Sequence, residues 1–331
     1  MHIRGKALYN LLSLSWREDS TLQVQRWQVE NYRALSLEEI FKRLKALDIV
    51  LSKESFLLYA ESCSSPEELT EFLWVKENDH EQQDQAYLLL FELWRRLVKD
   101  KQPLSIFCDE LDDRIDLYDR KALASDDGVQ EILAELEDVL DRHVDQGEKP
   151  KEVFSILSQS CAHDLETFIY DYIVDQIDQG HELYASELLD GFAEYVEDEK
   201  WFAFLRVRLF FSSDAEEGSR LLKGLLEQVQ EEPDVDLAFE MASFLVHAGD
   251  EALFWQTASL IFESLKTEAD FQELLAVISD YFRRRDQDQE HQNVQAIIAR
   301  RADKEGGALL TSKDVDRKRL KSLLTAQLST F

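Results

Sequence analysis

Glycine and proline are scarce in this chain of 331 residues, which contains 10 Gly and 4 Pro. A chain of this length with average composition would contain about 23 Gly and about 16 Pro. Tight turns between β-strands depend on these two residues, whereas the interiors of helices mostly exclude them. The scarcity therefore predicts an all-α protein.

Cysteine is also rare, and its spacing matches no redox or metal motif. Cys63, Cys108 and Cys161 stand far apart and form no CxxC pair, which argues against a disulfide framework and against a zinc site. Free cysteines are typical of a reducing compartment, so we expect a cytoplasmic protein. No apolar run approaches the roughly 18 residues that a membrane-spanning helix needs, so we expect no membrane span.

Motifs for the common catalytic and cofactor sites are missing. The sequence has no GxGxxG, GxxxxGK[ST], GxSxG or HExxH motif. Glu77-x-x-His80 has a spacing used in di-iron sites, but such sites need a second copy and two further glutamates. We therefore expect no catalytic residues, no cofactor and no metal. An all-α enzyme whose site leaves no local motif remains an alternative.

Charge is strongly unbalanced, with a formal net charge of −31. Residues 1–50 have 8 basic and 6 acidic side chains, residues 51–282 have 18 and 55, and residues 283–331 have 11 and 7. A body this acidic repels nucleic acid and anionic membranes and attracts basic partners. The densest acidic cluster, 109–116, lacks the glycine and closing glutamate of a calcium loop. We expect it to form a solvated helix face.

Several segments of the N-terminal half have clear helical patterns. Ser36 and Ser65, each followed three residues later by a glutamate, predict capping boxes at helix starts. Segment 86–98 is apolar nearly all round, so we expect it at the centre of this half. Segment 128–147 predicts an amphipathic helix. Its apolar stripe consists of Val129, Ile132, Leu133, Leu136, Val139, Leu140 and Val144.

The second half repeats with a period of about 34–35 residues, which is typical of arrays of helix pairs. The first helices of the pairs begin near Asp164, Glu199, Asp234 and Ala269, and the second near Glu182, Ala215, Glu251 and Gln287. One pair cannot bury its own apolar stripe, so neighbouring pairs stack into an α-solenoid. Segment 205–209 alternates like a strand, but the repeat register predicts a helix there. We expect Arg206 and Arg208, inside this apolar run, to form internal ion pairs, and binding of an acidic partner is the alternative.

Some positions of this array match a known repeat. Small residues stand at Ala185, Gly218 and Ala242, turns at 179–180 and 248–250 join the helices, and Pro233 resembles a closing proline. Over residues 164–302 the chain resembles the tetratricopeptide repeat family in a degenerate form. Phe254 departs from it, because the family has a small residue there. The resemblance implies a right-handed superhelix with a concave binding face, often followed by a C-terminal solvating helix.

In this register one stripe of each first helix lines the concave face. The candidate groove residues are Tyr170, Val174, Ile177, Val207, Phe210, Phe239, Val246, Leu274, Ile278 and Tyr281. An apolar groove suits the apolar face of a partner helix, so we expect a protein or peptide partner, basic or amphipathic-helical. The alternative is that this stripe is core and that the register is shifted by one or two positions.

The C-terminal segment 313–329 combines basic and apolar residues. Its basic residues are Arg317, Lys318, Arg319 and Lys321, and its apolar residues are Val315, Leu320, Leu323, Leu324 and Leu328. We expect a basic amphipathic helix that caps the array, because the apolar end of a solenoid must be covered. Contact with a membrane surface or nucleic acid is the alternative.

The sequence thus predicts three parts: an irregular helical domain over 1–149, tetratricopeptide-like repeats over 150–303, and a basic capping helix or tail over 304–331. The function that we expect is that of a non-enzymatic scaffold, adaptor or chaperone-like binder of protein segments. Nothing in the sequence identifies the partner.

Overall fold

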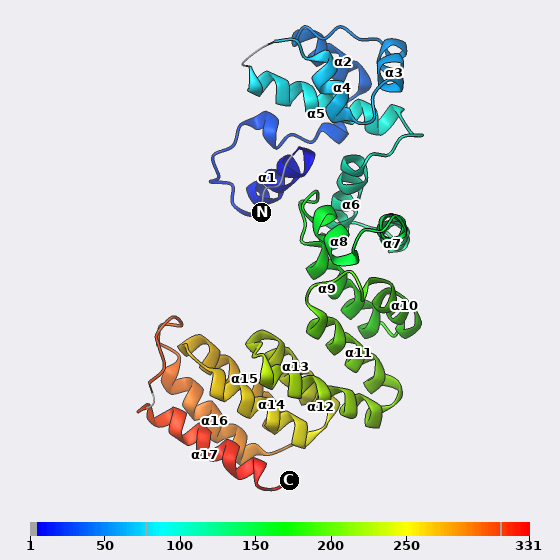
Figure 1. Ribbon diagram of the computed structural model, residues 1–331. Helices are drawn as coiled ribbons and strands as arrows, with labels where there is room; N and C mark the ends of the chain where they lie inside the picture. Colours follow the sequence, from blue (N-terminus) through cyan, green and yellow to red (C-terminus); the bar gives the residue numbers. More distant parts are fainter. Residues whose placement is uncertain (1–4, 77–78, 312) are drawn as a thin grey trace. The chain divides into compact units, whose positions relative to one another are not determined.

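The computed structural model describes residues 5–76, 79–311 and 313–331, and Glu77 of the Glu-x-x-His pair lies outside them. Over the described residues the protein has 17 α-helices and no strand, and 73% of it is helical, which confirms the all-α prediction. The chain forms two compact units, drawn in Figure 1. The first comprises the residues up to Ile169 together with Glu194–Glu197, and the second comprises Tyr170–Ala193 and Asp198–Phe331.

The first unit is built around one helix that is buried on all sides. Its helices are α1 (Lys6–Glu18), α2 (Leu37–Ala46), α3 (Lys53–Glu61), α4 (Pro66–Leu73), α5 (His80–Leu97), α6 (Leu104–Asp119), α7 (Asp127–Asp145), α8 (Pro150–Ser158) and the start of α9 (Leu165–Asp178), with 3-10 turns η1 (Arg26–Gln28) and η2 (Tyr32–Ala34). Every residue from Ala86 to Trp94 of α5 is buried. Helices α2 and α4 and the turn η2 pack on α5, so the predicted central helix is confirmed.

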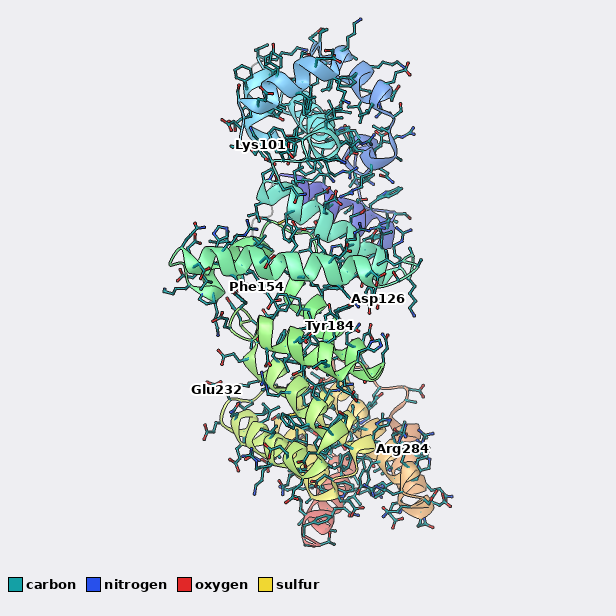
Figure 2. All side chains as sticks on the ribbon, turned by 90° about the vertical axis from the view of Figure 1, so that its right-hand side faces the viewer. Lys101, Asp126, Phe154, Tyr184, Glu232 and Arg284 are labelled. Atoms are coloured by element: carbon teal, nitrogen blue, oxygen red, sulfur yellow. The ribbon has the colours of Figure 1, made fainter. Side chains whose placement is uncertain are left out.

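Helix α7 carries the predicted stripe on its inner face. Five of the seven stripe residues are buried, and Val139 and Val144 are half-buried. Figure 2 shows Asp126 at the beginning of α7 and Phe154 of α8 beside the same helix. Because α8 packs on α7, the boundary expected near Pro150 falls inside the first unit, and the two units divide within α9 instead.

The two predicted capping boxes form only in part. The Ser36 hydroxyl accepts a hydrogen bond from the backbone N–H of Glu39, and Ser65 does the same for Glu68. The glutamates do not complete the reciprocal bonds. Glu39 pairs with Arg43, and the Glu68 carboxylate accepts from the backbone and hydroxyl of Ser64.

The second unit consists of helices that pack in pairs. They are the end of α9 and α10 (Glu182–Phe192), α11 (Glu199–Ser213), α12 (Ala215–Glu231), α13 (Val235–Ala248), α14 (Glu251–Ser264), α15 (Glu268–Arg284), α16 (Asp288–Arg301) and α17 (Val315–Leu328). Helix α11 packs on α12, α13 on α14, and α15 on α16. First helices also contact first helices, since α13 touches both α11 and α15. This order is consistent with a helical repeat, and segment 205–209 is helical, as predicted.

Helix α17 covers part of the second unit by packing on α14. Leu320 and Leu324 are buried in the core, and Leu323 and Leu328 pack against it. The expectation that Val315 belongs to this apolar face is wrong, since Val315 is 62% exposed. Its neighbours Asp314 and Asp316 both face Arg301, so the side chain between them points away.

A buried arginine joins α15, α16 and the start of α17. The Arg301 side chain is 1% exposed and donates to both oxygens of Glu268, which is 3% exposed. Its Nη1 lies 2.9 Å from the Asp314 carboxylate, and its guanidinium carbon lies 4.5 Å from the centre of the Phe271 ring. The arginine thus fixes the N-cap residue of α17 to the preceding helix pair.

Candidate functional site

Most of the predicted groove belongs to the core of the second unit. Six of the ten candidates are buried there: Val207, Phe239, Val246, Leu274, Ile278 and Tyr281. The reason is that α13 is enclosed by α11, α14 and α15, so the stripe on each of these first helices faces its neighbours. These six side chains do not line an open surface. They form core, which is the alternative stated above for this stripe.

The other four candidates are less buried. Tyr170, Val174 and Ile177 are half-buried, and the Tyr170 ring packs edge-on against Trp201 with centroids 5.4 Å apart. Phe210 is 38% exposed and lines a hollow of about 340 Å³ between α10 and α11. Phe210 is therefore the groove candidate most accessible to a partner.

Both arginines of α11 make ion pairs within the chain, but only Arg208 is largely buried, whereas Arg206 is 46% exposed. Arg206 lies 2.8 Å from Asp190 of α10, and Arg208 lies 2.7 Å from Asp178 of α9. Both contacts tie α11 to the helix pair before it. Arg206 also lines the hollow beside Phe210, so this wall of the hollow carries an exposed ion pair.

The basic residues of α17 do not share one environment. Lys318, Arg319 and Lys321 are exposed. Arg317 is half-buried, and its guanidinium lies over the Phe262 ring at 5.4 Å. Three of the four predicted basic-tail residues are therefore available to a partner, whereas Arg317 contributes to packing.

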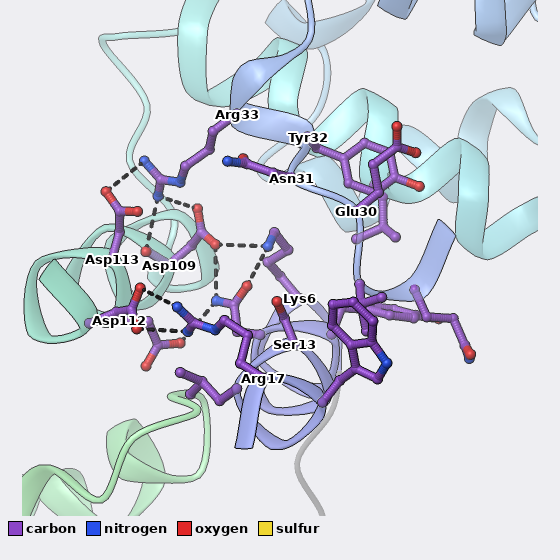
Figure 3. Close-up of a pocket in the computed structure, with 18 of the residues that line it drawn as sticks. Lys6, Ser13, Arg17, Glu30, Asn31, Tyr32, Arg33, Asp109, Asp112 and Asp113 are labelled. Carbon is purple, nitrogen blue, oxygen red and sulfur yellow. Dashed lines mark hydrogen bonds and ion pairs between the residues drawn. The ribbon is translucent and has the colours of Figure 1, made fainter. Parts of the chain in front are cut away.

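A polar cavity of about 380 Å³ in the first unit was not predicted from the sequence. It lies among α1, the segment 28–33 and α6, and Figure 3 shows carboxylates of α6 on one side of it and Glu30 and Tyr32 on the other. Asp109 and Asp112 in its wall are buried. The expectation that cluster 109–116 is a solvated face is therefore wrong for these two residues.

Asp109 is the centre of a network of ion pairs. Its carboxylate lies 3.1 Å from Lys6 Nζ and 2.6 Å from Arg33 Nη2, and it accepts from Asn10 Nδ2 at 3.0 Å. Burial by itself would raise the pKa of Asp109. The charges of Lys6 and Arg33 and the hydrogen bond from Asn10 outweigh burial and hold that pKa below its ordinary value. Asp109 is thus a buried carboxylate that stays charged.

Asp112 anchors the loop after α8 to α6. Its oxygens accept from Asn10 Nδ2, from the backbone N–H groups of Ala162 and His163, and lie 3.1 Å from His163 Nδ1. Protein groups therefore occupy both carboxylate oxygens of Asp112. The histidine is oriented by this contact and also lines the cavity.

Asp113 is the carboxylate of the cavity with the weakest compensation. It lies 3.4 Å from Arg33, which also serves Asp109 at 2.6 Å and Glu110 at 3.2 Å. The pKa of Asp113 is raised, mainly by burial and further by the negative charges of Glu110 and Asp109, against the lowering effects of Arg33 and Arg114. By contrast, the neighbouring Asp116 is held by two hydrogen bonds from Arg17, at 2.7 and 3.0 Å.

One signal in the sequence could have indicated this site. Asp109, Asp112 and Asp116 recur at i, i+3 and i+7, which is the spacing of a buried stripe on a helix. Lys6, Asn10 and Arg17 share one face of α1 in the same way. If the two helices pack together, the acidic stripe of α6 can form ion pairs and hydrogen bonds with the stripe of α1. The two stripes are about 100 residues apart in the sequence, so only the fold shows that they pair.

No protein-family model, curated protein or solved structure matches this chain. In the part of the chain that the structure describes, no three His, Cys, Asp or Glu side chains are grouped so that they could hold a metal ion. The described helices include none with the length and apolarity needed to cross a membrane.

Proposed function

We propose that the protein is a non-enzymatic, cytoplasmic scaffold or adaptor that binds segments of other proteins. Its second unit would be a right-handed, tetratricopeptide-like array of helix pairs, with α17 as the capping helix. The observation that carries this proposal is the packing order, in which pairs α11–α12, α13–α14 and α15–α16 stack through contacts of α13 with α11 and α15. Arrays of this kind present long surfaces that bind proteins.

The hollow between α10 and α11 is the docking point that we favour. Phe210 and Leu209 give it an apolar wall, and Glu182 contributes a carboxylate. Residues 51–282 carry 55 acidic against 18 basic side chains. A basic amphipathic helix complements both properties, because its apolar face covers Phe210 and its charges meet the acidic surroundings.

This docking point can be tested with Phe210→Asp, a change at a partly exposed position that the fold should tolerate. Ile156→Asp, at an exposed apolar position of α8, is the matched control. The wild-type chain and Ile156→Asp should retain the same stoichiometric protein partner from native lysate, and Phe210→Asp should lose it. Equal retention by both variants, with unchanged circular dichroism, would exclude the hollow as the docking point.

A second candidate function is binding of an anionic surface through α17. It is favoured by the exposure of Lys318, Arg319 and Lys321 on one helix. Reversing the charges of these three residues should abolish binding to anionic vesicles or to nucleic acid if this function is real, and binding should weaken with salt. The acidic remainder of the chain opposes this function, so we place it second.

Catalysis in the cavity of the first unit is less well supported than binding. His163 and several carboxylates do line the same cavity. However, Asp112 already accepts hydrogen bonds on both oxygens, and Asp109 is engaged in ion pairs with Lys6 and Arg33. Carboxylates that are saturated by protein donors serve to hold the fold, whereas general acid–base catalysis needs a group that is free to exchange a proton with substrate.

A further inference from the structure

Helix α1 buries little of its surface in the first unit. Only two of its thirteen residues, Ala7 and Tyr9, are buried, and its other apolar side chains are half-buried or exposed. By contrast, every residue from Ala86 to Trp94 of α5 is buried. Elements with few buried apolar contacts open at the lowest cost in a native protein. Helix α1 is therefore suited to local opening.

Polar side chains supply much of the attachment of α1 to α6. Figure 3 shows Lys6 and Arg17 of α1 facing the carboxylates of α6. The contacts are Lys6 with Asp109 at 3.1 Å, Asn10 with Asp109 and Asp112 at 3.0 Å each, and Arg17 with Asp116 at 2.7 and 3.0 Å. The face of α6 that carries these three aspartates is called the α1 seat below. Because salt screens such contacts near the surface, the attachment should depend on ionic strength.

Each carboxylate of the α1 seat also has a partner outside α1. These partners are Arg33 for Asp109 at 2.6 Å, the backbone N–H groups of Ala162 and His163 for Asp112 at 2.9 and 3.1 Å, and Arg120 for Asp116 at 3.3 Å. A buried charge that is left without a partner makes a structural change costly. Departure of α1 avoids this cost, because all three carboxylates keep a partner.

The segment after α1 can serve as a hinge. Residues 19–23 are all exposed. Among the described residues, their hydrogen bonds are made with one another and with Ser15 of α1. An exposed connection of this kind is more mobile than the elements that it joins. Helix α1 can therefore move away from α6 without breaking hydrogen bonds of the segment to the rest of the unit.

The charges beside the α1 seat are balanced only while α1 is in place. The cavity between the two helices is lined by Asp109, Asp112, Asp113 and Asp116 of α6 and by the cations Lys6, Arg17, Arg33 and Arg120. Its other two carboxylates, Glu30 and Glu92, pair with arginines outside the lining. Two of the four cations leave with α1. A second helix with basic side chains on one face and apolar residues beside them would restore the balance.

We propose that α1 is a reversible cover of the α1 seat. It opens while the rest of the first unit stays folded, and a basic amphipathic helix of another protein exchanges with it. In the closed state α1 occupies the seat and inhibits this binding. The partner helix rests on the proposed function of binding protein segments, whereas the opening of α1 does not.

Hydrogen exchange of the full chain, followed by mass spectrometry, tests the opening. Amides of α1 should exchange roughly tenfold or more faster than those of 86–94, a difference of about 1.4 kcal/mol in the free energy of opening. Raising sodium chloride from about 0.01 M to about 1 M shortens the Debye length from about 30 Å to about 3 Å and should widen this difference. Equal exchange in both helices, or no response to salt, would overturn the opening of α1.

A fluorescein-labelled peptide of residues 5–19 tests the exchange. It should bind the wild-type chain weakly, because the tethered α1 competes at a high effective concentration. Combining Lys6→Gln with Arg17→Gln loosens α1 of the full chain and should strengthen binding of the wild-type peptide severalfold. Adding Asp116→Asn to this loosened variant should weaken binding again. Arg142→Gln removes an exposed arginine from α7 and is the matched control, which should bind the peptide as the wild type does.

Three outcomes would overturn the exchange. They are peptide binding that is no stronger in the loosened variant than in the wild type, peptide binding that Asp116→Asn leaves unchanged, and a dimer of the loosened variant that excludes the peptide. The last outcome would assign the seat to α1 of a second copy. Phe210→Asp should behave as the wild type in both assays, so failure here is separate from failure of the docking point on the second unit.

Discussion

Arg301 offers the sharpest test of how the second unit is held together. Replacing it with methionine keeps the length and apolar character of the side chain and removes the guanidinium. Glu268, which is 3% exposed, then loses both hydrogen bonds from Arg301 and keeps the hydrogen bond from Gln272 Nε2, at 3.1 Å, and the contact with Lys304, at 3.9 Å. Asp314, the N-cap residue of α17, loses the Arg301 partner at 2.9 Å and keeps Lys304, at 3.4 Å.

The expected cost follows from these contacts. Removing one partner of a buried ion pair destabilises a protein by about 3–5 kcal/mol, because the other charge stays buried. The lost contact with the Phe271 ring adds roughly 0.5–2 kcal/mol. Against a typical stability of about 5–15 kcal/mol, Arg301→Met should therefore remove a large share of the stability of the second unit. Arg319→Met is the matched control, because Arg319 is exposed and makes one ion pair at 3.4 Å; it should cost about 0–1 kcal/mol.

Urea denaturation followed by circular dichroism measures these effects. Because the chain has two units, we expect two transitions, and only that of the second unit should shift. Adding Glu268→Leu to Arg301→Met should recover most of the loss, since an apolar pair can replace a buried ion pair. The reasoning fails if Arg301→Met costs no more than Arg319→Met, or if the double variant is as unstable as the sum of its single changes.

Three further predictions concern other parts of the fold. Leu136→Asp should destabilise the first unit strongly, whereas Glu135→Ala on the exposed side of α7 should be nearly neutral in thermal melts; equal effects would refute the helical phase. Deleting 313–331 removes two buried leucines worth roughly 1.5–3 kcal/mol each, so the truncated chain should melt lower and aggregate; unchanged melting would show that α17 is no cap. Burial would raise the pKa of Asp314, but the Arg317 backbone N–H and Arg301 hold it at about 2. This stabilisation is present above the unfolded pKa of about 3.9 and is lost as the pH falls towards 2, and Asp314→Asn should lose less stability over that interval.

Local patterns predict the helices of this protein well. The stripe of α7 and the uniformly apolar α5 were both identified from spacing alone, because one turn of helix brings residues i, i+3 and i+4 to the same side. The repeat period placed the helix pairs of the second half for the same reason. Such signals depend on neighbours in the sequence and do not require knowledge of the fold.

The face of each helix that stays open could not be predicted in this way. Val207, Phe239 and Ile278 have the spacing of a groove stripe and also that of a core stripe. Whether such a stripe is groove or core depends on which helix lies opposite it. In the same way, the ion pairs of Asp109 depend on Lys6 and Arg33, which are far away in the sequence. A basic residue such as Arg301 resembles a surface residue until three acidic partners are known to surround it.

The internal ion pairs also bear on the basic partner that we propose for this chain. Many of its 37 basic residues are used inside the fold, and Arg33, Arg95, Arg96 and Arg301 each contact more than one carboxylate or carbonyl oxygen. Such arginines neutralise interior carboxylates and contribute little to the outer surface. The surface that a partner meets is therefore more uniformly acidic than the sequence total suggests. The proposed docking point beside Phe210 lies on such a surface, so a basic segment complements the charge of its surroundings.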